Sequence, residues 1–588
     1  MSAFHRSFHL MMEPLSTLEA EAPEVPNVKR HSLRKSHGVH YTPPELASFV
    51  ARRSLTTLTR HDYVVLDPAC GDGELLLAVA REAERMGLRP PRLVGLDRDA
   101  DAVARANERL SAVRASDVVI DVGDFLALGA EAAGSAAGLY DLVVSNPPYV
   151  RTQVLGAARA QELGRQFGLT GRVDLYHAFV AAMTAKLGDG GVLGLLCSNR
   201  FLTTKGGASL RGLLLRNYEV AELWDLGDTK LFDAAVLPAV VVAKRTSKPG
   251  PTTGTFVRVY ESDAPSADGV ESDSLLGALE SGIEGSVRLQ HRSFDIERGQ
   301  LAEPSPEKPW QLASAHSSRW LRVVSAHAAG TLGDFGPIRV GVKTTADGVF
   351  IRPTWDDLPR DLIPEPELLH PLLTHRVAER WTASSDPDAT RWVLYPHETV
   401  DGRKRTIDLD RFPNAAAYLE QHRERLEGRA YVTKAGRAWY EIWVPQRPDA
   451  WAAPKLVWPD ISERPRFFLD SSGAIVNGDC YWLSCAERSD DEIALALAVS
   501  NSTFAVQHYD MCCGNRLYSG RRRFITQYVE ALPLPEASSA ALRDVSSMVA
   551  QLRTHAATSD TDARDAVERA LDSAVFEMFG LEEGAGKP

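Results

Sequence analysis

Residues 146–149, Asn-Pro-Pro-Tyr, place an amide, a rigid turn and an aromatic ring in one short loop. They follow an apolar run from Leu139 to Val144, which predicts a buried strand that ends at Ser145. Two successive prolines cannot continue a strand, because neither carries a backbone N–H. The strand therefore ends here and presents the four residues at its carboxyl end, where open α/β sheets bind ligands.

This loop suits the methylation of a planar amino nitrogen. The side-chain oxygen of Asn146 and the carbonyl oxygen of Pro147 can each accept one hydrogen of an –NH2 group, which draws the nitrogen lone pair out of conjugation. Tyr149 supplies a face on which a base can stack. We take Asn146, Pro147, Pro148 and Tyr149 as candidate catalytic residues, with a strand-ending turn as the plain alternative.

A glycine-bearing loop lies upstream, between a predicted strand over 63–66 and a predicted helix over 75–86. Its residues 67–74 read Asp-Pro-Ala-Cys-Gly-Asp-Gly-Glu, and Gly71 and Gly73 let the backbone approach a ligand closely. The loop carries three acids and no lysine, so it suits a cationic amino group better than a phosphate. S-adenosylmethionine has such an ammonium beside its sulfonium.

Acidic residues also follow the next two predicted strands, 93–96 and 118–122. Asp97 stands where an acid usually binds ribose hydroxyls. Asp124 can accept a hydrogen bond from an adenine, with Phe125 against the ring. Each acid alone could be a helix N-cap. Acids at three successive strand ends, with the catalytic loop at the fourth, are hard to explain as caps and indicate a cofactor site.

The sequence Thr42-Pro43-Pro44-Glu45 predicts the start of a helix, with Thr42 as N-cap and Glu45 completing a capping box. Such an N-terminus also binds a carboxylate well, although plain capping is the simpler explanation. Downstream of the catalytic loop, the hydrophobic pattern predicts a helix and three strands. These elements span residues 174–187, 192–197, 220–226 and 239–244.

Composition is typical of a soluble globular protein, with 44% hydrophobic and 24% charged residues in 588. No apolar run approaches a membrane span, and residues 1–12 lack the apolar core of a secretory signal. Six cysteines in so long a chain indicate a reducing compartment, so we expect a cytoplasmic protein. Cys480, Cys485, Cys512 and Cys513 do not follow a zinc-site spacing, and no metal is expected. A net charge of −12 still permits a local basic face for DNA.

The length predicts two or three domains. We expect an N-terminal extension over 1–37, a catalytic domain over 38–248, a linker region over 249–290 and a C-terminal domain over 291–588. A Pro- and Gly-rich stretch marks the linker, and every tryptophan except Trp224 lies after it.

One basic segment stands out in the C-terminal part. Arg521, Arg522 and Arg523 precede Phe524, a combination that can contact phosphates. An exposed loop is nearly as good an explanation of this triplet.

The motifs occur in a characteristic order: Thr42-Pro43-Pro44, Asp67-Pro68-Ala69-Cys70-Gly71, Asp97, Asp124, Asn146-Pro147-Pro148-Tyr149 and Phe232. In this order the chain resembles the gamma class of DNA N6-adenine methyltransferases, the Taq-type restriction-modification enzymes. The resemblance is strong over about residues 38–245 and weaker beyond. It implies an α/β fold: a class I S-adenosylmethionine-dependent (Rossmann-like) methyltransferase domain, followed by a mixed α+β target-recognition domain.

The resemblance also implies a set of contacts with the cofactor S-adenosylmethionine. Thr42 would contact the methionine end of the cofactor, and Asp67, Ala69 and Gly71 would contact its amino-acid moiety. Asp97 would bind the ribose. The cofactor adenine would lie against Asp124, Phe125 and Pro148. Tyr149 and Phe232 would sandwich the target adenine, which leaves the DNA stack. Asp67 is a departure, since Taq-type enzymes have glutamate there, but the charge is kept.

The partner implied is double-stranded DNA, with a separate cognate restriction endonuclease acting on the same site, and the chain is expected to act as a monomer. Three alternatives remain at this point. An RNA or protein-glutamine methyltransferase can use a similar loop, but such chains are generally short. A fused restriction enzyme would carry a nuclease before the methyltransferase. A non-catalytic DNA-binding subunit could keep the fold, but the intact catalytic loop speaks against it.

Overall fold

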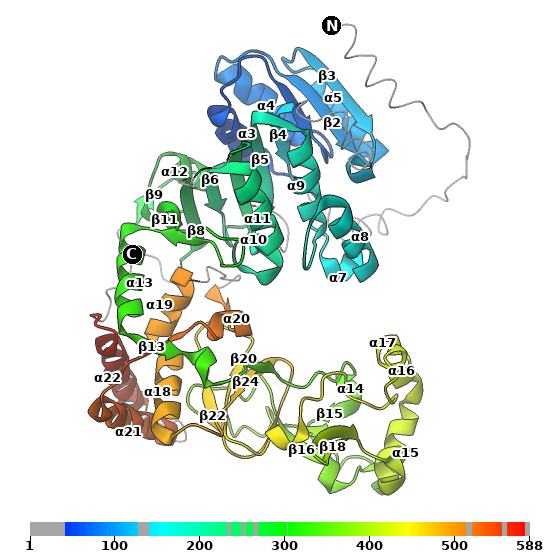
Figure 1. The fold of residues 1–588 in the computed structure, drawn as a ribbon, viewed down its shortest axis with the longest axis vertical. Helices are drawn as coiled ribbons and strands as arrows, with labels where there is room; N and C mark the ends of the chain where they lie inside the picture. The colour runs from blue at the N-terminus through cyan, green and yellow to red at the C-terminus, as the bar shows by residue number, and fades with distance from the viewer. Residues whose placement is uncertain are drawn as a thin grey trace.

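The structure, a computed structural model, describes residues 41–127, 140–231, 237–248, 250, 254–262, 269–302, 304–512, 520–555 and 561–582. The predicted extension over 1–37 lies outside these residues. The chain forms a large upper lobe, a helical region below it on the left, and a third lobe at the lower right (Figure 1). None of the described helices is long and apolar enough to cross a membrane.

One sheet forms the centre of the upper lobe, with strand order β3-β2-β1-β4-β5-β7-β6. Neighbouring strands are parallel except in the two pairs made by β7. The seven strands predicted from the sequence are confirmed. Their bounds are β1 (Val64–Asp67), β2 (Arg92–Asp97), β3 (Asp117–Val122), β4 (Tyr140–Ser145), β5 (Leu187–Ser198), β6 (Tyr218–Asp225) and β7 (Pro238–Arg245).

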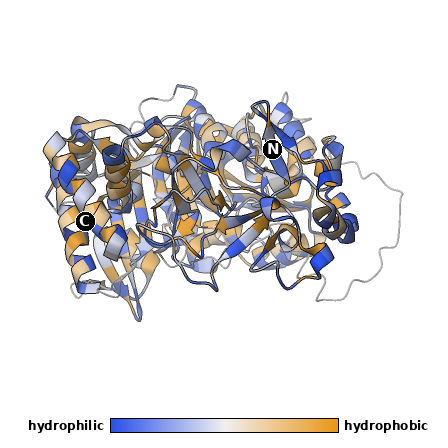
Figure 2. Cartoon of the chain, turned by 90° about the horizontal axis from the view of Figure 1, so that it is seen from below, coloured by the Kyte–Doolittle hydropathy of each residue, from blue (hydrophilic) through white to orange (hydrophobic). Residues whose placement is uncertain are grey.

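Helices cover both faces of this sheet, because its central strands are almost continuously apolar and must be buried on two sides. One face packs against α3 (Pro44–Thr57), α4 (Glu74–Arg85) and α5 (Ala100–Leu110). The other packs against α8 (Ala157–Phe167), α9 (Leu175–Lys186), α10 (Arg200–Thr203) and α11 (Ala208–Asn217). In Figure 2, hydrophobic residues gather on the strands at the centre of the molecule.

The sheet continues beyond β6, through part of the segment over 249–290 that the sequence predicts as a linker region. β8 pairs with β6 and is followed in the sheet by β11, β10 and β9, while β12 pairs with β11. These elements are β8 (Thr255–Glu261), β9 (Val270–Glu271), α12 (Leu275–Glu280), β10 (Gly285–Leu289), β11 (Arg292–Ala302) and β12 (Gln311–Ala313). β8 begins soon after the Pro/Gly-rich stretch, so the sheet resumes beyond that stretch.

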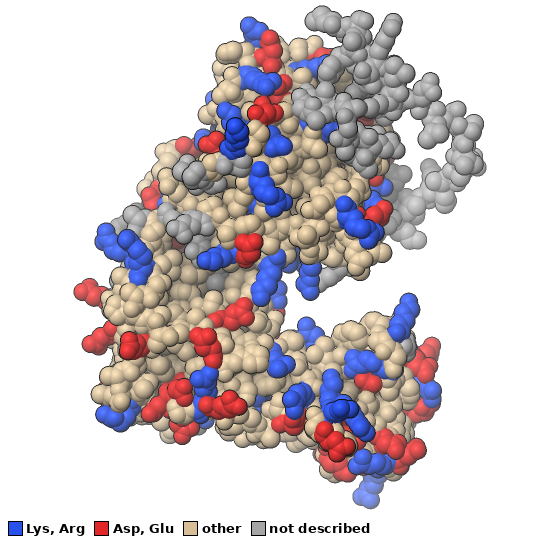
Figure 3. All heavy atoms as spheres, in the orientation of Figure 1, with Lys and Arg blue, Asp and Glu red and all other residues tan. Residues whose placement is uncertain are grey.

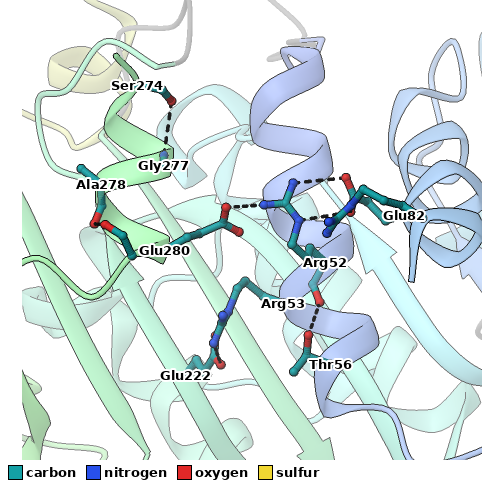
Figure 4. Close-up of polar contacts among 11 residues, drawn as sticks. Arg52, Arg53, Thr56, Glu82, Glu222, Ser274, Gly277, Ala278 and Glu280 are labelled. Atoms are coloured by element: carbon teal, nitrogen blue, oxygen red, sulfur yellow. Dashed lines mark hydrogen bonds and ion pairs between the residues drawn. The ribbon is translucent and has the colours of Figure 1, made fainter. Parts of the chain in front are cut away.

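Ion pairs attach this added part to the first helix of the domain (Figure 4). Arg52 of α3 pairs with Glu280 at the end of α12 and, through Nε, with Glu82 of α4 at 3.1 Å. The next residue, Arg53, donates from Nε to Glu222 of β6 at 2.8 Å. Segments more than 200 residues apart are thus held on one face of the sheet, so α12 belongs with the catalytic lobe.

The helical region below the sheet has its own apolar core. Its helices are α13 (Ala315–His327), α18 (Asp490–Asn501), α19 (Thr503–Cys512), α20 (Thr526–Val529), α21 (Ser539–His555) and α22 (Thr561–Met578). Two short pairings, β13 (Ala328–Thr331) with β26 (Pro533–Pro535) and β21 (Ile461–Ser462) with β25 (Arg522–Arg523), tie distant segments together. A C-terminal part that mixes helices and strands agrees with the α+β prediction.

The third lobe is built on two four-stranded sheets and a separate apolar core. The first sheet contains β14 (Arg339–Val340), β24 (Cys480–Ser484), β20 (Lys455–Pro459) and β22 (Phe468–Asp470), and the second β15 (Ile351–Arg352), β17 (Arg391–Leu394), β16 (Leu369–Leu373) and β23 (Ile475–Val476). Added to them are α14 (Asp347–Phe350), α15 (Pro413–Gln421), α16 (Arg423–Glu427), α17 (Ala430–Lys434) and the hairpin β18 (His397–Val400) with β19 (Arg403–Thr406).

Candidate active site

The candidate residues meet at the carboxyl edge of the parallel strands. Asp67 ends β1, Asp97 ends β2 and Ser145 ends β4. The register sets Leu66 of β1 beside Val143 of β4, so the glycine loop and the catalytic loop leave the sheet next to each other. Residues separated by up to about a hundred positions therefore form one site, as the strand-end pattern predicts.

Backbone geometry explains the glycines of the loop after β1. Gly71 has φ of +53° and Gly73 has φ of +82°, values that residues with a side chain rarely adopt. The amide of Gly71 donates to a carboxylate oxygen of Asp97 at 2.8 Å, and the other oxygen accepts from Asp99 at 2.9 Å. Asp97 therefore holds the glycine loop against β2, and each of its oxygens keeps a further lone pair for a ligand.

Two of the three acids in this loop are already paired inside the protein. Arg109 of α5 contacts Asp72 at 2.9 Å and also binds Glu74. Asp72 and Glu74 are thus engaged within the protein, and neither was predicted to contact the cofactor. Asp67 is different: its side chain is buried and accepts a hydrogen bond from the nearby Ala69 amide, at 3.2 Å. Burial raises the pKa of Asp67 to about 7, against the opposing effect of that amide.

At the end of β3, Asp124 and Phe125 make contacts within the protein. Asp124 accepts from the amides of Leu126 at 3.0 Å and Ala127 at 3.3 Å, so the capping role that competed with a cofactor role is present. Phe125 is buried and stacks on Phe179 of α9, with ring centroids 6.0 Å apart. The predicted contacts of Asp124 and Phe125 with a bound adenine therefore stay predictions.

The catalytic loop is oriented by the residue that was predicted to cap α3. The helix begins at Pro44 with Pro43 as N-cap, and no side chain caps it, so the predicted capping box with Thr42 is wrong. The hydroxyl of Thr42 instead accepts a hydrogen bond from Nδ2 of Asn146 at 3.0 Å. This contact turns the amide so that its oxygen points away from Thr42.

Tyr149 lies beside that oxygen. Its hydroxyl contacts Oδ1 of Asn146 as a donor and lies 3.3 Å from the carbonyl oxygen of Leu196. Its ring meets the edge of Tyr176 of α9, with centroids 6.2 Å apart at 85°. Burial holds the pKa of Tyr149 well above its ordinary value, so the phenol stays protonated and acts as a donor. The predicted second stacking residue, Phe232, lies outside the described residues.

The predicted phosphate contacts of the C-terminal triplet need a correction. Arg522 is buried, and its guanidinium bonds both oxygens of Asp510 at 2.8 Å as well as two backbone carbonyls. A phosphate could reach it only by breaking that pair, so Arg522 stabilises the fold. Arg523 pairs with Asp460 but is partly exposed, and Arg521 is exposed. Sequence alone could not separate these three, because burial alternates along the short strand β25.

Comparison with known proteins decides the family. A family model described as the Eco57I restriction-modification methylase matches residues 96–232. The type II methyltransferase M.BanIII of Aneurinibacillus aneurinilyticus is 37% identical over 571 residues, covering 93% of this chain and 98% of the relative. The chain belongs to the type II restriction-modification methyltransferases.

Two further matches also cover most of this methyltransferase. M.PaeR7I of Pseudomonas aeruginosa, also a type II methyltransferase, is 26% identical over 580 residues, covering 93% of this chain and 92% of that one. The structure of the type IIL restriction-modification enzyme MmeI in complex with DNA matches with a TM-score of 0.57 at 13% identity, covering 95% of this chain and 76% of MmeI. The class I methyltransferase fold is thereby confirmed, and the relatives favour a DNA methyltransferase over the RNA, protein-glutamine and non-catalytic alternatives.

Sequence reasoning missed several side chains that surround the catalytic loop of the methyltransferase. Tyr176 was predicted only as part of a helix start, although it is the aromatic neighbour of Tyr149. Arg151 and Arg200 flank the site without having been selected. Only their positions in the sequence could have identified them. Arg151 stands two residues after Tyr149, and Arg200 stands two residues after the end of β5.

Proposed function

We propose that this methyltransferase transfers a methyl group from S-adenosylmethionine to N6 of an adenine flipped out of double-stranded DNA. The observation that carries the proposal is the orientation of Asn146. Its amide nitrogen is bound by Thr42, so its oxygen is the atom offered to a substrate. An amide oxygen has two lone pairs and can accept from Tyr149 and from an amino group together. An exocyclic –NH2 on a planar base is the substrate that fits this acceptor.

The chain's own residues would act by positioning. Asn146 and the carbonyl of Pro147 hold the two amino hydrogens, which localises the lone pair on nitrogen. Tyr149 supports the ring, and its hydroxyl keeps the Asn146 amide in place. No general base is needed before attack, because the nitrogen becomes acidic only as the new bond forms. Orientation and electrostatics therefore account for the rate enhancement.

The residues at the strand ends fit S-adenosylmethionine, which when bound supplies an electrophilic methyl group. Gly71 and Gly73 hold the loop in left-handed conformations that bring the backbone close to a ligand. Asp67 is a buried acid whose raised pKa would fall on pairing with an ammonium, and Asp97 retains acceptors for ribose hydroxyls. Ala69 and Pro148 border the same edge, and the contacts with Asp124 and Phe125 are carried over from the resemblance.

The affinity for S-adenosylmethionine should depend on pH through Asp67. Because only the carboxylate pairs with the ammonium, and because burial raises the pKa of Asp67 to about 7, binding should weaken as pH falls below that value. We expect a loss of about 20-fold between pH 7.5 and 5.5. Isothermal titration calorimetry across this range measures it, and Asp67→Asn should bind more weakly with a much flatter profile. A wild-type profile as flat as that of Asp67→Asn would remove Asp67 from the cofactor site.

We propose a revised division of the chain, with a catalytic unit over residues 41–313 and a target-recognition unit over 314–588. The boundary follows the end of β12, the last strand joined to the central sheet. Figure 3 shows a hollow between the upper lobe and the third lobe, with lysines and arginines along both of its borders. This hollow is the natural place for duplex DNA, and a cognate endonuclease that cuts the same sequence remains part of the proposal.

Methylation-sensitive sequencing of DNA from cells that express the protein tests this function. The expected result is one short sequence motif in which a single adenine carries the new methyl group. Cells that express Asn146→Ala serve as the matched control and should lack the signal. A motif modified at cytosine would contradict the assignment to adenine while leaving the family unchanged.

A further inference from the structure

Two arginines that form no ion pair in the described part of the chain stand beside the catalytic loop. Arg151 stands two residues after Tyr149 and directly precedes α7 (Thr152–Leu155), while Arg200 begins α10 after β5. Because β4 and β5 are parallel neighbours, with Ser145 beside Leu195, both arginines lie at the edge that carries Asn146. Both side chains are exposed. Among the described residues, neither guanidinium makes a hydrogen bond or an ion pair, whereas Arg159 of the nearby helix α8 binds Glu162 at 2.8 Å.

A third arginine reaches this place from the C-terminal unit. Helix α20 docks on α10, where Tyr528 donates to the hydroxyl of Thr203 at 3.1 Å and Gln527 to its carbonyl oxygen at 3.2 Å. The docking fixes the segment just before α20, which carries Arg523. The pKa of Arg151 is lowered by partial burial and by the charge of Arg200, with Arg523 adding to the effect and Asp174 opposing it. The charges of Arg200 and Arg523 therefore act on Arg151 at the junction of the two units.

Two acids, Asp174 and Asp460, lie near this arginine cluster, which consists of Arg151, Arg200 and Arg523. Asp174 accepts from the amide of Thr152 at 2.8 Å and from its hydroxyl at 3.0 Å, so it is occupied in holding α7. Asp460 pairs with Arg523, which leaves Arg151 and Arg200 as the members of the cluster without an ion pair among the described residues. Like charges gathered in this way repel each other unless an anion lies between them, and guanidinium groups bind phosphate with paired hydrogen bonds.

We propose that Arg151 and Arg200 bind the DNA phosphates on either side of the flipped nucleotide, and that Arg523 adds to this phosphate site from the target-recognition unit. The inference rests on the proposed function, since a base held at Asn146 brings its own phosphates to this edge. Holding both flanking phosphates keeps the rotated backbone in place while the base occupies the pocket. Because Arg523 is positioned by the α10–α20 contact, correct seating of the recognition unit completes the site. These arginines are positioning residues.

The test uses the full-length protein and a duplex that contains its methylation motif. Each phosphate near the modified base is replaced in turn by an uncharged methylphosphonate, and binding is measured by fluorescence anisotropy. Wild-type protein should lose affinity at the two flanking phosphates. Arg151→Gln and Arg200→Gln should each lower the slope of log affinity against log salt by about one unit. Each variant should also become insensitive to methylphosphonate at the phosphate that its arginine contacts.

Two controls separate this role from a general effect on folding. Arg89→Gln changes an exposed arginine, paired with Asp62, that precedes β2 at the opposite edge of the sheet, and it should leave every value unchanged. Arg151→Lys and Arg200→Lys keep the charge and should retain most of the salt slope. Affinity for S-adenosylmethionine should stay at the wild-type level in all variants, and the single-turnover rate at saturating DNA should fall less than the DNA affinity.

The wild-type measurement alone can overturn the proposal. If neither flanking methylphosphonate weakens binding, the arginine cluster does not hold these phosphates, whatever the variants do. Unchanged salt slopes in both glutamine variants would have the same meaning. The mapping is made around whichever base the protein methylates, so modification of cytosine would contradict the proposed function without deciding the phosphate contacts.

Discussion

Replacing Asn146 with alanine should lower the rate of methyl transfer by about 10²–10³-fold, the range found when one oriented hydrogen-bonding group is removed from an active site. The reason is that the variant loses the oxygen that accepts an amino hydrogen, and with it the contact that Thr42 makes to orient the amide. The stacking face of Tyr149 remains. Single-turnover kinetics with enzyme in excess of DNA measures the chemical step directly.

Binding measurements complete this first prediction. Affinities for DNA and for S-adenosylmethionine should stay within a few-fold of the wild-type values, because Asn146 acts on the reacting nitrogen. A matched control is Asn217→Ala, since the side-chain amide of Asn217 donates to the carbonyl oxygen of Leu213 within α11, at 2.8 Å, far from the catalytic loop in sequence. A normal transfer rate in Asn146→Ala would mean that the loop does not act on the amino group.

Tyr149→Ala should weaken the hold on the flipped base by roughly 1–3 kcal/mol, the usual contribution of stacking between a base and an aromatic ring. This corresponds to about a 5- to 150-fold loss in the population of the reactive complex. A 2-aminopurine at the target position reports the change, because its fluorescence rises when the base leaves the stack. The rise seen with wild-type protein should be clearly smaller with Tyr149→Ala.

Tyr149→Phe separates the ring of Tyr149 from its hydroxyl. The hydroxyl donates to Asn146 and lies near the carbonyl oxygen of Leu196, so its removal costs some orientation of the amide. If stacking is the main role, Tyr149→Phe and Tyr149→Trp should recover much of the activity. If Tyr149→Phe is as inactive as Tyr149→Ala, the hydroxyl contact with Asn146 is the essential feature and the stacking role is wrong.

Much of the catalytic lobe could be predicted because its signals are local. A buried parallel strand is a short apolar run, and a strand that ends in Asp67, Asp97 or the Asn-Pro-Pro-Tyr loop marks one edge of the sheet from sequence alone. The parallel arrangement then brings these ends together without further information. This is why the positions of the candidate residues could be predicted before their partners were known.

Features that depend on partners distant in sequence could not be predicted in this way. The hydroxyl of Thr42 bonds a residue 104 positions away, and a helix start looks the same whether or not its threonine serves as a cap. Arg522 and Arg521 are adjacent, yet only the first meets Asp510 in the interior. The extension of the sheet through β8 could not be predicted, because proline and glycine residues suggest a linker but do not show whether the chain returns to the same sheet.

The most direct test of the account is to identify the base that the purified protein methylates. The protein is incubated with DNA and S-adenosylmethionine carrying a deuterated methyl group, and the DNA is digested to nucleosides for mass spectrometry. The account predicts label in N6-methyldeoxyadenosine with the wild-type protein and almost none with Asn146→Ala. Label in a methylated cytosine, or equal labelling by the two proteins, would contradict it.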